Sequence, residues 1–175
     1  MVNSGGSRDL LSWARSVATG ADARALMARE IALVPEPLRD ALDLSRVRLI
    51  DRAHNPFALG KILVRGNDIY WPRTPRDFTS ASVAMQSLLI HELAHVLQYA
   101  TGRLTALGYL TRPENWRYRY EVREGAQFDD YTVEAQADLV QDWFLMRRGH
   151  PPAHHRGKTP TRDWLEGVVD FSLRT

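Results

Sequence analysis

The longest apolar segment of the chain runs from Ser80 to Tyr99 and holds two histidines and a glutamate in its middle. A helix is predicted here because apolar residues recur at intervals of three and four, at Met85, Leu89, Leu93, Val96 and Ala100. Further apolar residues lie on the other side of this helix. A helix that is apolar on most faces is normally packed between other layers. We therefore predict that this helix forms the centre of the fold.

The middle of this predicted helix reads His91-Glu92-Leu93-Ala94-His95, which is the HExxH pattern. Positions four residues apart share one face of a helix, so both imidazoles can point at one metal ion. Glu92 is turned away by about 100°, and it can instead reach a water molecule on that ion, where a general base is needed. Burying two imidazoles and a carboxylate without a cation is costly. We therefore predict a zinc ion with His91 and His95 as ligands and Glu92 as the catalytic base.

A catalytic zinc site takes three protein ligands, and because the chain has no cysteine the third must be histidine or carboxylate. The metzincin pattern is excluded, since Gln98 and Thr101 stand where it needs a glycine and a third histidine. The best candidate is Glu134, on a helix predicted over residues 132–147. Asp138, one turn later, can accept the outer N–H of His91. The remaining histidines are interpreted as surface residues: His54, His150, His154 and His155.

The patterns on either side of the motif complete the predicted fold. Helices are predicted over residues 7–20, 21–33 and 162–173, and short strands over 47–50, 62–64, 68–71 and 118–122. The strands before the motif are expected to form a small antiparallel sheet, with a hairpin turn at Gly66 and Asn67. At 175 residues, the chain is expected to be one α+β domain over 1–175. Its parts would be an N-terminal helical part (7–43), a core (45–148), and a C-terminal linker and helix (150–175).

These motifs together resemble a known group of enzymes. HExxH followed by Glu134 and Asp138 in an E-x-x-x-D pattern resembles the gluzincin group of zinc metallopeptidases. Residues 67–71, 89–98 and 131–137 resemble, more closely, bacterial metallopeptidases described as Vgr-related or Rhs-associated. The resemblance covers roughly residues 45–146, and the connection from His95 to Glu134 is longer than in compact gluzincins. It implies a zincin-like fold, zinc held by His91, His95 and Glu134, Glu92 as the base, and an association with contact-dependent secretion systems.

Two further roles are expected in a site of this type. In gluzincins a strand just before the motif helix holds the peptide substrate in extended form, and residues 69–71 occupy that place in the sequence. The alternative is a plain hairpin strand. A tyrosine or histidine normally stabilises the oxyanion of the reaction. Tyr131 is the nearest candidate in sequence, and Tyr118, Tyr120 and His150 compete with it.

We therefore expect a zinc metallopeptidase that hydrolyses peptide bonds, with a peptide or protein substrate. The alternative is a non-catalytic zinc-binding adaptor or interaction module of a bacterial secretion system. A secretion-system component and a cognate inhibitor protein are the other expected partners. Nucleic acid is not, because the net charge is only +2 and the arginines are scattered. No segment is long and apolar enough for a membrane span. The first seven residues do not form a signal peptide, so we expect cytoplasmic synthesis and export through a contact-dependent system.

Overall fold

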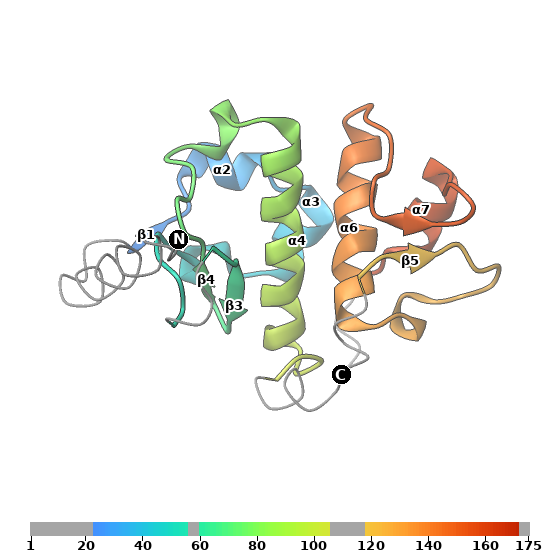
Figure 1. Ribbon diagram of the computed structural model, residues 1–175, viewed down its shortest axis with the longest axis horizontal. Helices are drawn as coiled ribbons and strands as arrows, with labels where there is room; N and C mark the ends of the chain where they lie inside the picture. Colours follow the sequence, from blue (N-terminus) through green and yellow to red (C-terminus); the bar gives the residue numbers. More distant parts are fainter. Residues whose placement is uncertain (1–22, 56–59, 106–117, 172–175) are drawn as a thin grey trace, which may run out of the picture.

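Two long helices lie side by side at the centre of the computed structural model, which describes residues 23–55, 60–105 and 118–171 (Figure 1). Helix α4 (Val83–Ala100) carries the HExxH motif, and helix α6 (Val133–Arg147) packs against it. Each begins at a hydroxyl cap: Ser82 accepts the backbone N–H of Met85, and Thr132 accepts that of Ala135. Both helices begin and end within three residues of their predicted bounds.

A four-stranded sheet lies beside α4, on the side away from α6 (Figure 1). Its order is β1-β2-β4-β3, formed by Ala23–Ala25, Arg48–Ile50, Asp68–Tyr70 and Leu63–Arg65 respectively. The predicted antiparallel sheet is wrong in one pairing, because β2 and β4 run parallel while the other two pairs are antiparallel. After β2 the chain crosses to the far edge of the sheet and forms β3 there. The turn at Gly66 and Asn67 then returns β4 alongside β2 in the same direction.

The N-terminal elements differ from the prediction. The helix predicted over 7–20 lies outside the described residues, and the helix predicted over 21–33 is wrong in its first half. Residues 23–25 form β1, which pairs with β2, and helix α2 spans only Ala28–Leu33. A further helix, α3 (Glu36–Ala41), follows Pro35. Proline suits the start of a helix as well as the end of the preceding one, because its missing N–H is not needed there.

Glu30 ties α2 to the rest of the molecule and is fully buried. Its carboxylate accepts hydrogen bonds from the guanidinium of Arg24, at 2.7 and 2.8 Å, and from the backbone N–H groups of Met27 and Phe78, at 2.9 and 3.0 Å. Burial raises the pKa of Glu30, but these donors outweigh burial and hold the pKa below its ordinary value of 4.5. The buried carboxylate is therefore charged and fully paired.

The C-terminal part packs on the far side of α6 (Figure 1). Strand β5 (Tyr120–Glu121) lies within the predicted strand 118–122 and pairs in parallel with β6 (His155–Arg156). The pairing places a strand in the segment predicted as a plain linker. Helix α7 (Arg162–Val168) ends earlier than predicted and packs on α6. Within residues 23–55, 60–105 and 118–171, three short 3₁₀ segments are also present: Leu44–Arg46, Phe78–Ser80 and Phe128–Asp130.

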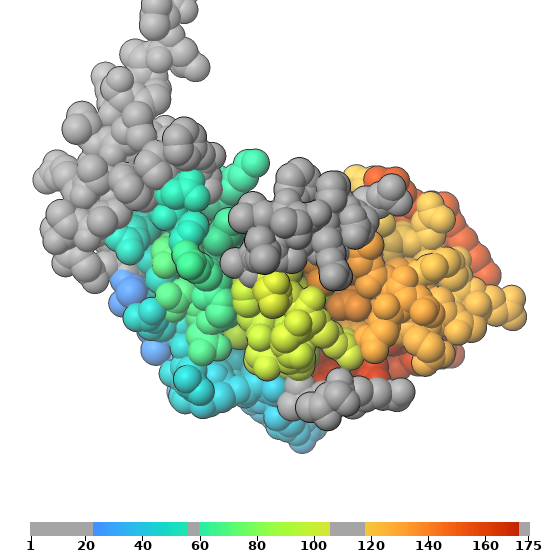
Figure 2. All heavy atoms as spheres, turned by 90° about the horizontal axis from the view of Figure 1, so that it is seen from below, coloured from blue at the N-terminus to red at the C-terminus, as the bar shows by residue number. Residues whose placement is uncertain are grey.

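The apolar core lies between these layers and is centred on α4. Side chains that are fully buried there come from α4 and α6 and from the elements on either side, among them Leu38, Leu49, Ile69, Leu89, Leu93, Leu139 and Phe144. Seen from below, the end of α4 lies between the sheet side in green and the α6 side in orange (Figure 2). The α+β prediction is confirmed. None of the described helices combines the length and apolar character that a membrane span requires.

Candidate metal centre and its cavity

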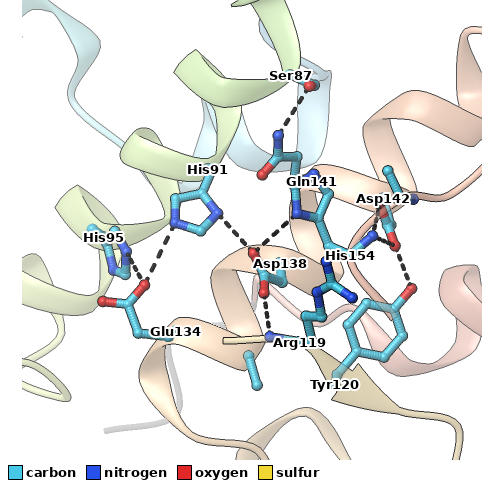
Figure 3. Close-up of polar contacts among 12 residues, drawn as sticks. Ser87, His91, His95, Arg119, Tyr120, Glu134, Asp138, Gln141, Asp142 and His154 are labelled. Atoms are coloured by element: carbon cyan, nitrogen blue, oxygen red, sulfur yellow. Dashed lines mark hydrogen bonds and ion pairs between the residues drawn. The ribbon is translucent and has the colours of Figure 1, made fainter. Parts of the chain in front are cut away.

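Three side chains converge where α4 and α6 face each other (Figure 3). His91 and His95 come from one face of α4, and Glu134 comes from the first turn of α6. Oε2 of Glu134 lies 3.2 Å from Nε2 of His95 and 3.6 Å from Nε2 of His91. All three residues are buried, and their potential ligand atoms lie within 4.8 Å of one another. The structure therefore brings together the three residues that the sequence proposed as ligands.

This group could hold a metal ion. In a tetrahedral zinc site with bonds of about 2.0–2.2 Å, neighbouring ligand atoms lie about 3.3–3.6 Å apart, close to the two distances from Glu134. Two imidazole nitrogens and one carboxylate oxygen also form a donor set that suits zinc and leaves a position open. The residues present fit a catalytic zinc ion in both spacing and chemistry.

The outer nitrogen of His95 is fixed by Gln98, one turn later on the same helix. Nδ1 of His95 lies 2.8 Å from Oε1 of Gln98, so Nδ1 carries the hydrogen and Nε2 keeps its lone pair. The amide of Gln98 donates in turn to the carbonyl of Val133, at 2.8 Å, and to Oε1 of Gln136, at 3.0 Å. Gln98 was not among the predicted site residues. Its spacing of three from His95 was the available signal.

Asp138 lies beside the outer nitrogen of His91. Nδ1 of His91 is 3.3 Å from Oδ1 of Asp138, a close charged contact whose angles are not those of a hydrogen bond. The other oxygen of Asp138 accepts the backbone N–H of Arg119 at 2.6 Å. Arg119 has a φ of 70°, in the left-handed region that non-glycine residues seldom adopt. A strained backbone residue thus helps to hold the carboxylate next to the imidazole.

The charges of the group call for a cation. Burial lowers the pKa of His91, but the carboxylates of Asp138 and Glu134 outweigh it and raise the pKa to about 10. Burial raises the pKa of Glu134, but the two imidazoles outweigh it and lower the pKa to about 2. Both shifts arise because buried carboxylates need a positive charge beside them. A proton on His91 supplies that charge, and a divalent cation on the same atoms would supply more of it.

Glu92 lies in the same buried region but does not belong to the cluster of potential ligand atoms. Burial raises its pKa, the imidazoles of His91 and His95 oppose this, and the negative charge of Glu134 adds to it. A carboxyl group whose pKa is raised is a stronger proton acceptor than an ordinary one, which suits a general base. The position that the sequence assigned to the base is therefore next to the ligand group and chemically suited to that role.

The group opens into a cavity of about 550 Å³, within the size range of small-molecule and peptide pockets. Residues of α4, α6 and β3 form much of its wall, and the charged or titratable lining residues are His54, Arg65, His91, Glu92, His95, Tyr99, Tyr118, Glu134, Asp138 and His154. Strand β3 is at the edge of the sheet, whereas β4 pairs on both sides. The strand role suggested for residues 69–71 is therefore wrong, and the edge strand that lines the cavity is Leu63–Arg65.

Of the four candidates for oxyanion stabilisation, one lines the cavity and three do not. The hydroxyl of Tyr131 donates to the carbonyl of Glu121, and that of Tyr120 donates to Asp142 at 2.8 Å. Both are turned away from the cavity and do not line it. His150 is exposed and does not line the cavity either. Tyr118 lines it, with 53% of its surface exposed.

Three of the histidines interpreted as surface residues are partly buried. His54 and His154 line the cavity, and Nδ1 of His154 lies 3.6 Å from Oδ1 of Asp138 (Figure 3). Nδ1 of His155 lies 4.0 Å from Asp142. None of them belongs to the group of potential ligands. The histidines after α6 lie in a segment that folds back onto that helix through backbone hydrogen bonds, which leave no periodic pattern in the sequence.

Comparison with known proteins places this site in a biological context. No protein-family model matches the sequence. The chain is 33% identical over 132 residues to the type VI secretion system spike protein VgrG2b of Pseudomonas aeruginosa, and the match covers 70% of this chain and 13% of VgrG2b. Its fold is similar to that of the effector domain of P. aeruginosa VgrG2b, with a TM-score of 0.59 and 26% sequence identity. That match covers 82% of this chain and 88% of the domain. The similarity supports the Vgr-related part of the resemblance found in the sequence.

Proposed function

We propose that this chain is a zinc-dependent metallopeptidase domain that acts as an effector of a bacterial secretion system. The observation that carries the proposal is the convergence of His91, His95 and Glu134 in the wall of a cavity of about 550 Å³, with Glu92 beside them. Two neighbouring helices, one with HExxH and one with the third ligand, support a gluzincin-type zincin arrangement. These three residues would hold the zinc ion.

The ligand residues are held in place before any metal binds. Gln98 fixes the ring of His95, and Asp138 lies against the outer nitrogen of His91. Such partners set which nitrogen faces the metal and make the imidazole a stronger ligand. Zinc, when bound, would polarise the scissile carbonyl and make a water molecule more acidic.

Glu92 would carry the proton between the two halves of the reaction. As a water oxygen attacks the carbonyl carbon, the Glu92 carboxylate accepts a proton from that water. It then gives the proton to the amine nitrogen as the C–N bond breaks, so each turnover returns the carboxylate to its starting form. The raised pKa of Glu92 favours the first of these transfers, in which the carboxylate accepts the proton, and its place in the cavity wall gives it access to the substrate.

The substrate we propose is an extended peptide. Among the strands that the structure describes, β3 has a neighbour on one side only, and it lines the same cavity as the ligand group. A peptide that adds to such an edge is held by backbone hydrogen bonds, which select an extended chain rather than one particular sequence. The cavity beside Leu63–Arg65 would then place one peptide bond of the substrate next to Glu92.

The delivery route is proposed from the similarity to VgrG2b. That protein is named as a type VI secretion spike protein, and the structure that this fold matches is its effector domain. We infer that this chain is likewise an effector that reaches its target through contact-dependent secretion. A cell that makes a peptidase for this purpose would need an inhibitor protein, which is the second partner we propose.

Digestion of casein and of a random-peptide mixture by the zinc-loaded protein tests the activity. We expect cleavage that a chelator stops and added zinc restores. Glu92→Gln should keep the metal and lose about 10²-fold or more of the rate, because the amide cannot accept the proton. His150→Ala, an exposed histidine outside the cavity, is the matched control and should cleave at the wild-type rate. Stoichiometric zinc without any cleavage would instead favour a non-catalytic zinc-binding module of the secretion system.

A further inference from the structure

Asp142 is a fully buried carboxylate that the proposed chemistry does not use. It lies one turn beyond Asp138 on α6, and it accepts the hydroxyl of Tyr120 at 2.8 Å. It also accepts the backbone N–H of Ala153 at 2.8 Å and that of His154 at 3.0 and 3.2 Å. Through these hydrogen bonds the carboxylate holds the segment after α6 against that helix. A buried charge with this many donors is well compensated.

The segment that Asp142 holds delivers one side chain to the cavity. His154 lines the cavity wall, and its Nδ1 lies 3.6 Å from Oδ1 of Asp138, the same oxygen that faces His91 (Figure 3). Its backbone is held by one aspartate and its ring lies against another. The side chain is 33% exposed, and Nε2 makes no hydrogen bond within the described part of the chain. A histidine whose backbone is held by hydrogen bonds and whose Nδ1 faces a carboxylate leaves its other ring nitrogen for a ligand.

We propose that His154 is a further catalytic residue, which donates a hydrogen bond from Nε2 to the oxygen of the scissile carbonyl as negative charge develops there. This inference rests on the proposed peptidase function. In the imidazolium form both ring nitrogens carry a hydrogen, so Nδ1 can face the Asp138 carboxylate as an ion pair while Nε2 donates to the substrate. No covalent bond forms at His154, and its proton stays on the ring throughout.

The positions of the rival side chains support this choice. Tyr120 and Tyr131 have their hydroxyls committed to Asp142 and to a backbone carbonyl. Tyr118 reaches the cavity, but more than half of its surface is exposed. A donor acts on developing charge only when it is already held in place, because reorganising it during the reaction would cancel the gain. His154 is held in place by Asp142, which accepts its backbone N–H. Asp142 is therefore a positioning residue in this proposal, and the hydroxyl of Tyr120 donates to it in turn.

Two substitutions of His154, to glutamine and to asparagine, distinguish a contact with the substrate from mere support of Asp138, because their side chains differ in length. The amide nitrogen of glutamine lies close to the place of Nε2, whereas that of asparagine lies close to the place of Nδ1. His154→Gln can therefore still reach a substrate oxygen, and His154→Asn can still contact Asp138. If His154 only supported Asp138, asparagine would be the better replacement. If it contacts the substrate, glutamine is the better one.

The assay uses the zinc-loaded chain and a quenched fluorescent peptide chosen because the wild-type protein cleaves it. His154→Ala should lower kcat by about 10²- to 10³-fold, the typical effect of removing one oxyanion donor, with KM and zinc content unchanged. His154→Gln should recover part of kcat, and His154→Asn should not. His150→Ala again serves as the matched histidine control.

The outcomes distinguish this inference from the function on which it rests. No cleavage of any peptide by the wild-type protein contradicts the peptidase function and this inference with it. Cleavage that His154→Ala leaves unchanged overturns the role of His154 alone, as does rescue by asparagine but not glutamine. Lost zinc in His154→Ala would also overturn it, since the residue would then serve the metal through Asp138.

A second pair of variants tests the positioning role. Asp142→Asn leaves one acceptor oxygen but turns the other into a donor that faces Tyr120 or a backbone N–H. It should reduce kcat with zinc content unchanged. Tyr120→Phe removes a single hydrogen bond to Asp142 and guards against the case in which the asparagine variant does not fold. A smaller loss of kcat in the folded phenylalanine variant supports the proposal, and wild-type kcat in it contradicts the link through Tyr120.

Discussion

Replacing Gln98 with leucine tests whether the partner of a metal-binding imidazole controls the affinity of this site. Leucine has a similar volume and no acceptor, so Nδ1 of His95 loses its contact at 2.8 Å. Loss of such an outer partner typically weakens metal affinity by about 10–100-fold. We therefore expect the zinc dissociation constant of Gln98→Leu to rise by that factor, measured by competition with a chromogenic chelator.

The same substitution also affects stability, and the structure offers a matched control for it. Gln98 makes three hydrogen bonds among the described residues, to His95, Val133 and Gln136. Gln136 also makes three, to Gln98 and to the carbonyls of Phe128 and Tyr131 at 3.1 Å. At about 1 kcal/mol for each bond, Gln98→Leu and Gln136→Leu should each lower the free energy of unfolding by about 3 kcal/mol.

Only the first variant removes the partner of a ligand. Urea denaturation of the metal-free proteins should therefore give similar losses of stability for the two variants, while the chelator competition should show weakened zinc binding only for Gln98→Leu. Wild-type zinc affinity in Gln98→Leu would refute the reasoning. Equal weakening in both variants would show that general destabilisation, and not the contact with His95, controls the affinity.

Three other predictions concern the ligands and one buried acid. His91→Ala or His95→Ala should abolish stoichiometric zinc in elemental analysis, because each removes one of two imidazoles that share a helical turn; full occupancy in both would contradict the metal site. The zinc dissociation constants should rise from wild type through Asp138→Asn to Glu134→Ala, because only the last removes a proposed ligand, and chelator competition gives the order. The lowered pKa of Glu30 means that this carboxylate stabilises the fold above about pH 4.5 and loses that contribution as the pH falls through its folded pKa. The stability difference between wild type and Glu30→Gln in urea should accordingly shrink as the pH falls below about 4.5, and a constant difference would contradict the assignment.

The sequence predicted the parts of this fold that depend on local pattern. Helical spacing of apolar residues located α4 and α6, and the HExxH spacing located two of the three proposed ligands. The pattern could not show that Ala23–Ala25 would leave a helix and pair with β2, because that choice depends on a strand 25 positions along the chain. The parallel pairing of β2 with β4 is likewise decided by a crossover between distant segments.

The contacts that support the site could be predicted only in part from the sequence. Asp138 was found because it lies four residues from Glu134 on one helix, and Gln98 was overlooked although it lies three residues from His95. The backbone N–H groups that the two aspartates accept belong to segments without helical or strand periodicity, at Arg119 and at residues 153–154. A contact made by a backbone amide leaves no residue type to recognise, and so it enters the account only with the structure.

Three acids in a row along α6 connect the proposed metal ligand, the partner of His91 and the residue that positions His154. Glu134, Asp138 and Asp142 recur at intervals of four, and each is at most 3% exposed. At 1.5 Å per residue they span about 12 Å of one helix face, and a buried row of like charges is unfavourable unless each member has its own partner. The first faces two imidazoles, the second two imidazoles and a backbone amide, and the third backbone amides and a hydroxyl. Because the second acid contacts both His91 and His154, it joins the proposed ligand group to the proposed oxyanion donor. A change at Asp138 should therefore affect zinc affinity and kcat together, whereas a change at Asp142 should affect kcat alone.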